Sequence, residues 1–373
     1  MQTKLCLQNL AFIPSQQNDT ELKPMLERHR KSLSALEQRN RLRALIPARG
    51  LDFSSNDYLA LSQSPSMRVA LIAALERGLD VGASGSRLLR GNHPEHEALE
   101  AEAAAFFQSE KALFWSAGYV ANLALFSTLP QRGDLVIYDE FIHASCHDGM
   151  RASHAECIAA KHNDPQAVTD VIKNWRAKGN TGRVWIAVES LYSMDGDQAP
   201  LADLVAIADS HEAFLIIDEA HATGVFGPDG RGFSAGLEGR ENIIGVHTCG
   251  KALGAMGALI CAPAVLCDYL VNRARAFIYS TAPSPLMAAA VRHALTLLRK
   301  EPERRERLHQ LIVFANQQLK ARCGRHGNGS QIVPFVVGTD GPTMKLAAAM
   351  QSRGYDIRGI RPPTVPQGTA RLR

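Results

Sequence analysis

The sequence predicts an α/β protein built on a mostly parallel sheet, and three observations support this. Apolar runs alternate with helical segments between residues 82 and 263, an order that is typical of βαβ units. The runs are short, rich in β-branched residues and free of polar alternation, as expected for strands covered on both faces. The 373 residues are 46% hydrophobic and 21% charged, which is ordinary for a globular protein with enough chain for two domains.

The expected elements follow in chain order. Residues 20–46 predict a helix, because leucines recur on one face while Arg and Lys occupy the other. A turn-rich stretch, 53–58, leads into a helix over 66–78. The alternating region holds helices at 95–108, 119–129 and 201–211 and strands at 111–115, 134–138, 183–188, 213–217, 242–247 and 258–262. Beyond it we expect helices at 264–278, 284–299, 302–322 and 342–353 and a strand at 331–337.

This order divides the chain into three parts. We expect an N-terminal helical arm (1–60), a large domain around the sheet (61–298) and a smaller C-terminal α+β domain (299–373). The longest uncharged stretch, 252–267, is short for a membrane span and is interrupted by Gly and Pro, so no membrane segment is expected. Residues 1–13 are broken by polar residues and do not resemble a signal peptide.

Charge and cysteine content exclude other classes of protein. The formal charge is +4, from 41 Lys and Arg against 37 Asp and Glu, and the basic residues are scattered, which gives no case for nucleic-acid binding. The seven cysteines form no C-x-x-C pair and are odd in number, so neither a disulfide framework nor a zinc cluster is expected. This usage fits a reducing cytoplasm. The cysteines are Cys6, Cys146, Cys157, Cys249, Cys261, Cys267 and Cys323.

Residues able to do chemistry follow five of the expected strands. Because ligands of open α/β sheets bind at the carboxyl ends of the strands, we expect these side chains to converge on one site. Taken alone, an Asp after a strand is equally explained as a helix cap, and a lone His as a structural residue. The convergence is what points to function. In chain order the residues are Gly118 with Tyr119, His143, Glu189 with Ser193, Asp218 with His221, and Thr248 with Lys251.

Lys251 is the most specific of these residues. Small neighbours let a large ligand approach the amine, and an apolar surround favours its neutral, nucleophilic form. A nucleophilic amine on an α/β sheet predicts a Schiff base with pyridoxal phosphate. The small neighbours are Gly250, Ala252, Gly254, Ala255 and Gly257.

Pyridoxal phosphate needs further partners, and the strand ends provide candidates for each. Asp218 is expected to keep the pyridine nitrogen protonated, so that the ring withdraws electrons. His221 is expected to reach the phenolic oxygen, and the imidazole of His143 offers a plane for stacking. The helix that begins at Gly118 presents free N–H groups to a phosphate, and the Thr248 hydroxyl adds a donor.

Competing motifs are incomplete. His143 and His147 are spaced like a zinc pair, but no Glu follows the first His as in H-E-x-x-H, so no metal is expected. The sequence has no G-x-x-x-x-G-K-[ST] segment, which excludes that phosphate-binding loop. The glycines of 82–87 imitate a dinucleotide-binding loop, but no strand precedes them. They are explained either as a tight turn or as a loop near the cofactor pocket.

Longer motifs extend the pattern from residue 53 to residue 373. On these motifs the chain resembles the α-oxoamine synthases, fold-type I pyridoxal-phosphate enzymes that condense an amino acid with an acyl thioester and release carbon dioxide. The resemblance implies a large cofactor-binding domain, a small C-terminal domain and a homodimer with active sites at the subunit interface. The motifs are FSSNDYL (53–59), GSR (85–87), SAGY (116–119), HAS (143–145), ESLYSMDGD (189–197), DEAHATG (218–224), TCGK (248–251) and YST (279–281).

The resemblance also implies substrates and individual roles. Residues 162–164 and 360–369 are most similar to the biotin-pathway branch of the family, which implies L-alanine and pimeloyl-CoA or pimeloyl-acyl-carrier protein as substrates. Lys251 then carries the cofactor and removes the α-proton, in a catalytic set with His143, Asp218 and His221. The implied cofactor contacts are Gly118, Tyr119, His143, Ser193, Asp218, His221, Thr248 and, toward the neighbouring subunit, Ser280 or Thr281. The implied substrate contacts are Arg39, Asn56, His143, Arg361 and Thr364.

Two other functions stay open at this point. A glycine C-acyltransferase making 2-amino-3-oxobutyrate shares the same cofactor residues, because the amino-acid pocket cannot be built from sequence. A non-catalytic partner subunit is the second alternative, although such subunits lack the lysine that Lys251 provides. Family members continue past the position of Arg373 with further strand and helix, so the small domain is expected to be incomplete at its end.

Overall fold

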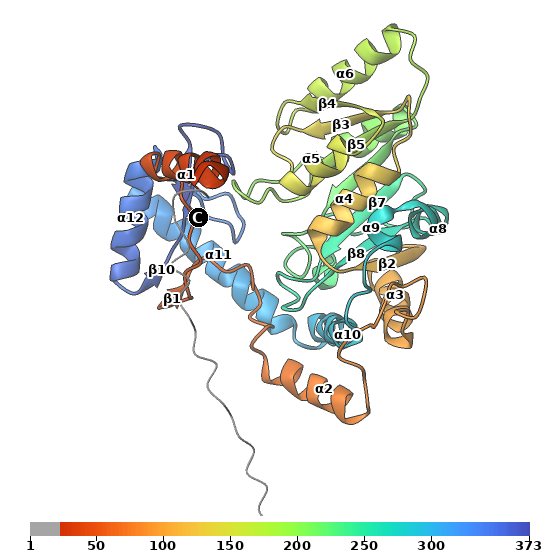
Figure 1. The fold of residues 1–373 in the computed structure, drawn as a ribbon, viewed down its shortest axis with the longest axis horizontal. Helices are drawn as coiled ribbons and strands as arrows, with labels where there is room; N and C mark the ends of the chain where they lie inside the picture. Colours follow the sequence, from red (N-terminus) through yellow and green to blue (C-terminus); the bar gives the residue numbers. More distant parts are fainter. Residues whose placement is uncertain (1–22) are drawn as a thin grey trace, which may run out of the picture. The chain divides into compact units, whose positions relative to one another are not determined.

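The computed structural model describes residues 23–373, and a seven-stranded sheet forms the core of residues 54–334 (Figure 1). Neighbouring strands run parallel except at β8, which is antiparallel to both β2 and β7. The predicted α/β fold with a mostly parallel sheet is therefore confirmed. In spatial order the strands are β2 (Lys111–Trp115), β8 (Ala258–Ala262), β7 (Ile243–Thr248), β6 (Phe214–Asp218), β5 (Val184–Glu189), β3 (Leu135–Asp139) and β4 (Glu156–Ala160).

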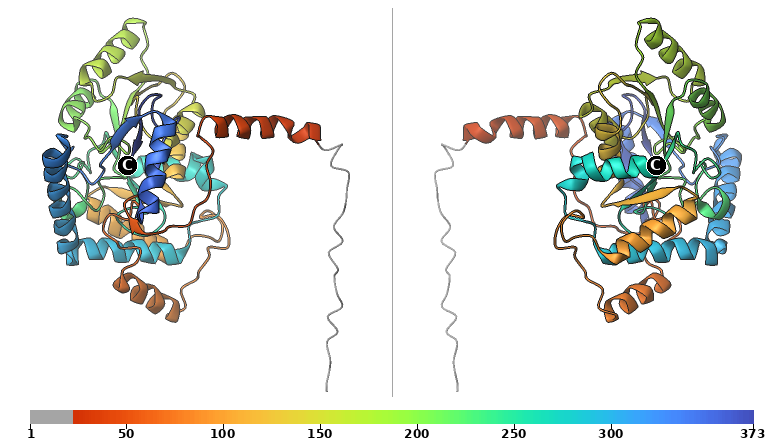
Figure 2. Two further views of the ribbon diagram at one scale, coloured as in Figure 1. Left: turned by 90° about the vertical axis from the view of Figure 1, so that its left-hand side faces the viewer. Right: turned by 90° about the vertical axis from the view of Figure 1, so that its right-hand side faces the viewer.

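Helices cover both faces of this sheet, which explains why its strands are apolar throughout (Figures 1 and 2). Alternate residues of each strand point to opposite faces, so Val136 packs in one cluster and Ile137 in another. One face is covered by α4 (Gly118–Thr128), α5 (Ala144–Arg151) and α8 (Ala264–Arg273). The other is covered by α3 (Pro94–Phe107), α6 (Pro165–Ala177), α7 (Leu201–Ser210) and α10 (Pro285–Lys300).

Several elements differ from the sequence expectation. The helix expected over 264–278 is interrupted at Ala274, whose extended backbone (ψ 111°) separates α8 from the short α9 (Arg275–Ile278). Strand β4 and helices α5 and α6 were not predicted. Strand β4 is a sheet edge with an exposed first residue, so its apolar signal is short. Helix α5 contains Gly149, a poor helix former.

The remaining elements of the larger unit lie beside α10. Helix α2 (Pro65–Glu76) packs against α10, and α11 (Pro302–Cys323) follows it after a break at Glu301. The imidazole Nε2 of His309 on α11 contacts the Val225 carbonyl at 2.8 Å. A short 3₁₀ turn, η1 (Pro228–Gly230), completes this part of the chain.

A smaller unit combines the two ends of the described chain. It contains α1 (Lys23–Gln38), and β1 (Leu51–Asp52) pairs in parallel with β10 (Tyr355–Asp356). Strand β12 (Ala370–Leu372) pairs antiparallel with both β9 (Phe335–Gly338) and β11 (Gly359–Ile360). Helix α12 (Asp340–Ser352) packs on these strands.

The two units are bounded differently from the three predicted parts. The smaller unit joins the described part of the first 53 residues with Phe335–Arg373, and the larger unit is Ser54–Pro334. Leu59 and Leu61 are buried in the core of the larger unit, so residues 54–60 belong to that unit and not to an N-terminal arm. Residues 20–22 of the expected first helix, and Cys6, lie outside the described residues. Between residues 23 and 373, no helix is long and apolar enough to cross a membrane.

Candidate active site

A cavity of about 280 Å³ lies at the carboxyl ends of the strands of the larger unit. This is the position at which open α/β sheets bind ligands. Most of the larger-unit residues singled out from the sequence lie at its wall. The lining is Asn56, Ala117, Gly118, Tyr119, Asn122, His143, Ser145, Glu189, Asp218, Ala220, His221, Thr248, Gly250, Lys251, Ala255, Met256 and Gly257.

Lys251 stands on a tight loop that follows β7. The Cys249 N–H donates to the Gly257 carbonyl at 2.8 Å, and the Gly254 N–H donates to the Lys251 carbonyl at 2.9 Å. Gly254 adopts φ +60°, and a β-carbon there would lie 2.3 Å from the Ser62 nitrogen. Gly254 is therefore required by the loop itself, which presents the half-buried Lys251 at the cavity.

Asp218 is linked to His143 through a chain of hydrogen bonds. The Asn122 Nδ2 group on α4 donates to Asp218 Oδ2 at 2.8 Å and to Ser145 Oγ at 3.0 Å. Ser145 Oγ lies 2.8 Å from His143 Nδ1, and the Ser145 N–H donates to the same nitrogen at 3.3 Å. Because a backbone N–H can only donate, His143 Nδ1 is the acceptor and the neutral ring carries its proton on Nε2.

The electrostatic surroundings keep His143 neutral. Desolvation lowers the pKa of its imidazole, and the nearby Lys251 ammonium lowers that pKa further, while Asp218 opposes both. The ring therefore forms an uncharged wall of the cavity at neutral pH. A neutral ring suits stacking on another aromatic system.

His221 is held by Tyr58, which belongs to an early segment of the larger unit, and by Gln331 near the end of that unit. The Tyr58 hydroxyl lies 2.6 Å from His221 Nδ1 and donates to Asn56 Oδ1 at 3.1 Å. The Gln331 side chain donates to the His221 carbonyl at 2.8 Å. These contacts place the buried His221 beside Asn56 at the cavity wall.

The start of α4 has the features of an anion site. Its N-cap is Ala117, which offers no side chain to the free N–H groups of the first turn. Gly118 follows, and a β-carbon there would lie 2.5 Å from Cγ2 of Thr248. The close approach of Thr248 brings its hydroxyl-bearing side chain against the helix start, while that hydroxyl donates to the Ala220 carbonyl at 3.3 Å.

Glu189 is a cavity residue to which the sequence assigned no role. It ends β5 beside Asp218 on β6 and is buried. Burial and the Asp218 charge raise the pKa of the Glu189 carboxyl to about 8, although Lys251 opposes the shift. Its Oε2 accepts from the Ser193 N–H at 3.0 Å, and no hydrogen-bond partner within the described residues faces Oε1. Its position directly after an apolar strand was the sequence signal that could have assigned it to the site.

Some predicted site residues do not line the cavity. Ser193 is buried on the loop after β5. Ser280 and Thr281 border a separate hollow of about 20 Å³ with Arg87 and Phe114. Their assignment to a neighbouring subunit's phosphate stays a prediction.

Three predicted substrate residues, Arg39, Arg361 and Thr364, belong to the smaller unit. There Arg361 donates to the Asn40 carbonyl, and burial lowers the pKa of its guanidinium, with Arg43 and Arg41 adding to this effect. The Thr364 N–H donates to the Arg361 carbonyl at 3.1 Å. Their roles toward a substrate stay predictions.

Comparisons with known proteins agree with the site. The model of the family "Aminotransferase class I and II" matches residues 48–373. An 8-amino-7-oxononanoate synthase from Chromobacterium violaceum is 42% identical over 354 residues, covering 93% of this chain and 90% of that protein.

Two solved structures share the fold. A serine palmitoyltransferase from S. paucimobilis with a bound PLP–myriocin aldimine has a TM-score of 0.83 at 26% identity, covering 94% of this chain and 92% of that one. An 8-amino-7-oxononanoate synthase from Francisella tularensis has a TM-score of 0.72 at 29% identity, covering 87% of this chain and 90% of that one. The chain therefore belongs to the aminotransferase class I and II family, in the group of the 8-amino-7-oxononanoate synthases.

Proposed function

We propose that this protein is a pyridoxal-phosphate-dependent acyltransferase of biotin biosynthesis. It condenses L-alanine with a pimeloyl thioester to give 8-amino-7-oxononanoate, carbon dioxide and the free thiol carrier. The observation that carries the proposal is the convergence of Lys251, Asp218 and His143 on one cavity at the carboxyl ends of the strands. The relatives of the same group support the substrates.

The residues at the cavity fit pyridoxal phosphate. The uncapped start of α4 beside Gly118 suits a phosphate, since free N–H groups and the helix dipole both favour an anion. The Asn122 Oδ1 and Glu189 Oε1 atoms are buried without a hydrogen-bond partner within the described residues. Both oxygens at the cavity wall can therefore form hydrogen bonds with a bound ligand. Lys251 supplies the amine that the aldehyde of the cofactor requires.

Each residue at the cavity has a proposed task. When bound, pyridoxal phosphate supplies an electron sink for negative charge at the α-carbon of the amino acid. Asp218, oriented by Asn122, holds a proton on the pyridine nitrogen. His143 presents a neutral ring for stacking, and Lys251 takes the α-proton. Asn56 is proposed to bind the carboxylate of the amino acid, and Arg361 to bind it as a fork.

Partners and location complete the proposal. The acyl donor is pimeloyl-CoA or pimeloyl-acyl-carrier protein, and the functional form is a homodimer in the cytoplasm. In the dimer, Ser280 or Thr281 is proposed to contact the cofactor phosphate bound by the neighbouring subunit. Both residues lie on an exposed segment of the chain, which leaves them accessible to a second subunit. No partner other than these is proposed.

Product analysis separates this function from its alternatives. Purified protein is incubated with pyridoxal phosphate, with either pimeloyl-CoA or acetyl-CoA, and with either L-alanine or glycine, and each product is identified by mass spectrometry. With L-alanine and pimeloyl-CoA we expect two products, 8-amino-7-oxononanoate and carbon dioxide, in equal amounts. Preferential use of glycine with acetyl-CoA would identify a glycine C-acyltransferase, and the absence of any condensation would favour a non-catalytic subunit.

A further inference from the structure

The loop from Ser190 to Asp197 connects β5 to the rest of the site and closes on itself. The Tyr192 N–H donates to the Asp197 carbonyl at 2.9 Å, and the Gly196 N–H donates to the Tyr192 carbonyl at 2.8 Å. A bridge between Leu191 and Gln198 ends the turn. These bonds make the loop a compact unit, so its position relative to the sheet depends on its contacts with the surrounding residues.

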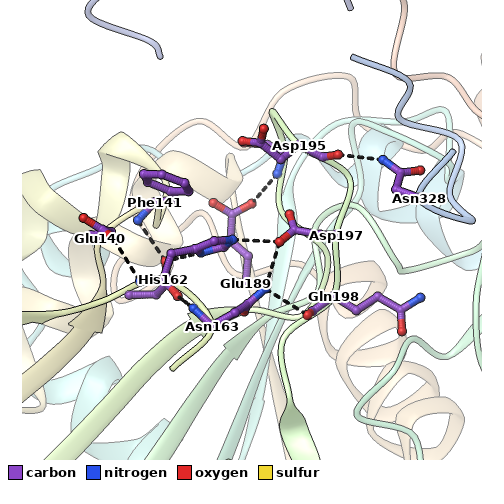
Figure 3. Close-up of polar contacts among 11 residues, drawn as sticks. Glu140, Phe141, His162, Asn163, Glu189, Asp195, Asp197, Gln198 and Asn328 are labelled. Carbon is purple, nitrogen blue, oxygen red and sulfur yellow. Dashed lines mark hydrogen bonds and ion pairs between the residues drawn. The ribbon is translucent and has the colours of Figure 1, made fainter. Parts of the chain in front are cut away.

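His162 provides such a contact between the loop and the sheet (Figure 3). Its Nδ1 lies 2.8 Å from Asp139 Oδ1 at the end of β3, and its Nε2 lies 2.7 Å from Asp197 Oδ2. One imidazole thus joins a carboxylate on a buried strand to a carboxylate on the loop. The ring is enclosed by Phe141, with centroids 4.5 Å apart, and by the edge of Tyr192 at 4.5 Å.

Neighbouring groups strengthen the same connection. The Asn163 side chain donates to Asp197 Oδ2 at 2.8 Å and to the Gln198 carbonyl at 3.1 Å, while its N–H donates to Asp139 Oδ2 at 2.8 Å. The His162 N–H donates to Glu140 Oε1 at 3.0 Å (Figure 3). His162 and Asn163 therefore act as one clamp on the loop.

The other side of the loop is held by Asn328. Its Nδ2 group donates to the Asp195 carbonyl at 2.6 Å (Figure 3). The same group donates to the Ile332 carbonyl at 2.7 Å. Gly196 adopts φ +71°, and a β-carbon there would lie 2.3 Å from Asn328 Nδ2. Asn328 and the clamp of His162 and Asn163 therefore hold the loop from two sides. Ser190 at the start of the loop is held as well, because its hydroxyl donates to Glu219 Oε2 at 2.8 Å.

The position of the loop determines the orientation of the Glu189 carboxyl group at the cavity. The Ser193 N–H donates to Glu189 Oε2 at 3.0 Å, so a movement of the loop releases this carboxyl group. Glu189 is buried, pairs in register with Asp218 and faces the cavity that holds Lys251. A displaced Glu189 would therefore change the surroundings of both residues.

We propose that His162 is a positioning residue for the reaction: by joining Asp139 to Asp197 it fixes the 190–197 loop, and through Ser193 it fixes the Glu189 carboxyl at the cavity. The role does not require His162 to touch the substrate or the cofactor. The inference rests on the proposed function, because the cavity is taken to bind pyridoxal phosphate.

The protonation of His162 gives this role a pH dependence. Burial alone lowers the pKa of His162, but hydrogen bonds to Asp139 and Asp197 and their charges outweigh burial and raise the pKa to about 10. The other ionisable groups beside the ring are Glu140 and Tyr192. A neutral imidazole has a single N–H and can donate to only one of the two carboxylates, so the clamp opens when His162 loses its proton.

The test measures cofactor affinity and loop protection in four variants. These are His162→Gln, Asp197→Asn, the double variant, and Arg292→Gln as a matched control. Arg292 also joins two carboxylates, Glu95 and Glu102, each at 2.5 Å, but on the helices remote from the loop. The dissociation constant for pyridoxal phosphate is measured by absorbance titration, and amide exchange of residues 190–197 is measured in the cofactor-free protein.

We expect each single loop variant to bind pyridoxal phosphate about tenfold more weakly, and the double variant to bind no more weakly than the weaker single one. Amides in the loop exchange faster in all three, while Arg292→Gln resembles the wild type in both measurements. The affinity ratio between wild type and His162→Gln falls toward one above about pH 10, because the wild type then loses the clamp as well.

The inference would be overturned by variants that bind and exchange as the wild type does, or by a double variant in which the two losses multiply. Losses equal to those of Arg292→Gln would also overturn it, since they would report only general destabilisation. Failure of the wild type to bind pyridoxal phosphate is a different result, because it would refute the proposed function itself.

Discussion

Asn122 and Asp218 lie 96 residues apart in the chain, yet the Asn122 amide donates to the Asp218 carboxylate over 2.8 Å in a buried setting. The same amide reaches Ser145, which contacts His143. One side chain on α4 therefore orients both the carboxylate and the imidazole that are proposed to meet the cofactor ring. Both contacts of Asn122 join residues that are distant in the sequence.

Replacing Asn122 by Ala is expected to change the orientation of the Asp218 carboxylate, although Asp218 itself is unchanged. Among the described residues, the carboxylate would keep only the hydrogen bond from the Ala220 N–H. Loss of a hydrogen bond to a charged group costs about 1.5–3 kcal/mol. We expect weaker pyridoxal phosphate binding by about tenfold in an absorbance titration. Ser127→Ala on the same helix, where the hydroxyl donates to the Leu123 and Ala124 carbonyls of its own helix, is the control and should bind normally. Equal affinity in both variants would refute the coupling.

Gly118→Ala tests the fit at the start of α4. The added methyl would lie 2.5 Å from Cγ2 of Thr248, which forces the two elements apart and spoils the proposed phosphate site. We expect the phosphate-bearing cofactor to bind about tenfold or more weakly, while pyridoxal without phosphate is affected less. The second change Thr248→Ser removes Cγ2 and keeps the hydroxyl, so the double variant should regain affinity. A double variant as weak as Gly118→Ala would show that the clash is not the cause.

Glu189→Gln is expected to stabilise the protein in a pH-dependent manner. The folded-state pKa of Glu189 is raised from 4.5 to about 8, so the unfolded chain releases this proton more readily than the folded one. The glutamate therefore costs stability increasingly as pH rises from about 4.5 to about 8, and the glutamine avoids that cost. Unfolding in urea should show the variant about 1–3 kcal/mol more stable at about pH 8.5, with a smaller difference near pH 5. A difference that does not change with pH would contradict a raised pKa.

The sequence predicted the sheet well because its strands are buried on both faces. The runs expected at 111–115 and 258–262 match β2 and β8 residue for residue. The alternation of strands with helices predicted the parallel pairing of β3, β5, β6 and β7, but not the antiparallel pairing of β8 with β2 and β7. Strand β4 was missed because an edge strand is partly exposed, and β10, β11 and β12 were missed because two or three residues carry no periodicity. Such strands exist through tertiary pairing, which a local pattern does not record.

The site was predictable where residues follow strands directly. Lys251, Asp218, His143 and Thr248 lie at strand ends, and the topology brings those ends to one edge. Tyr58 and Asn122 had no such signal, because their contacts with His221 and Asp218 depend on how distant elements pack. Contacts of the kind predicted for Ser280 and Thr281 depend on a second copy of the chain, which a single-chain pattern does not specify.

The attachment point of the cofactor tests the account most directly. The protein is mixed with pyridoxal phosphate, reduced with borohydride, digested and analysed by mass spectrometry, with Lys251→Ala and Lys161→Ala treated in parallel. We predict a yellow protein with a pyridoxyl group on the peptide that contains Lys251. That label should vanish in Lys251→Ala and persist in Lys161→Ala. Labelling of another lysine, or no uptake of the cofactor by the wild type, would contradict the central claim.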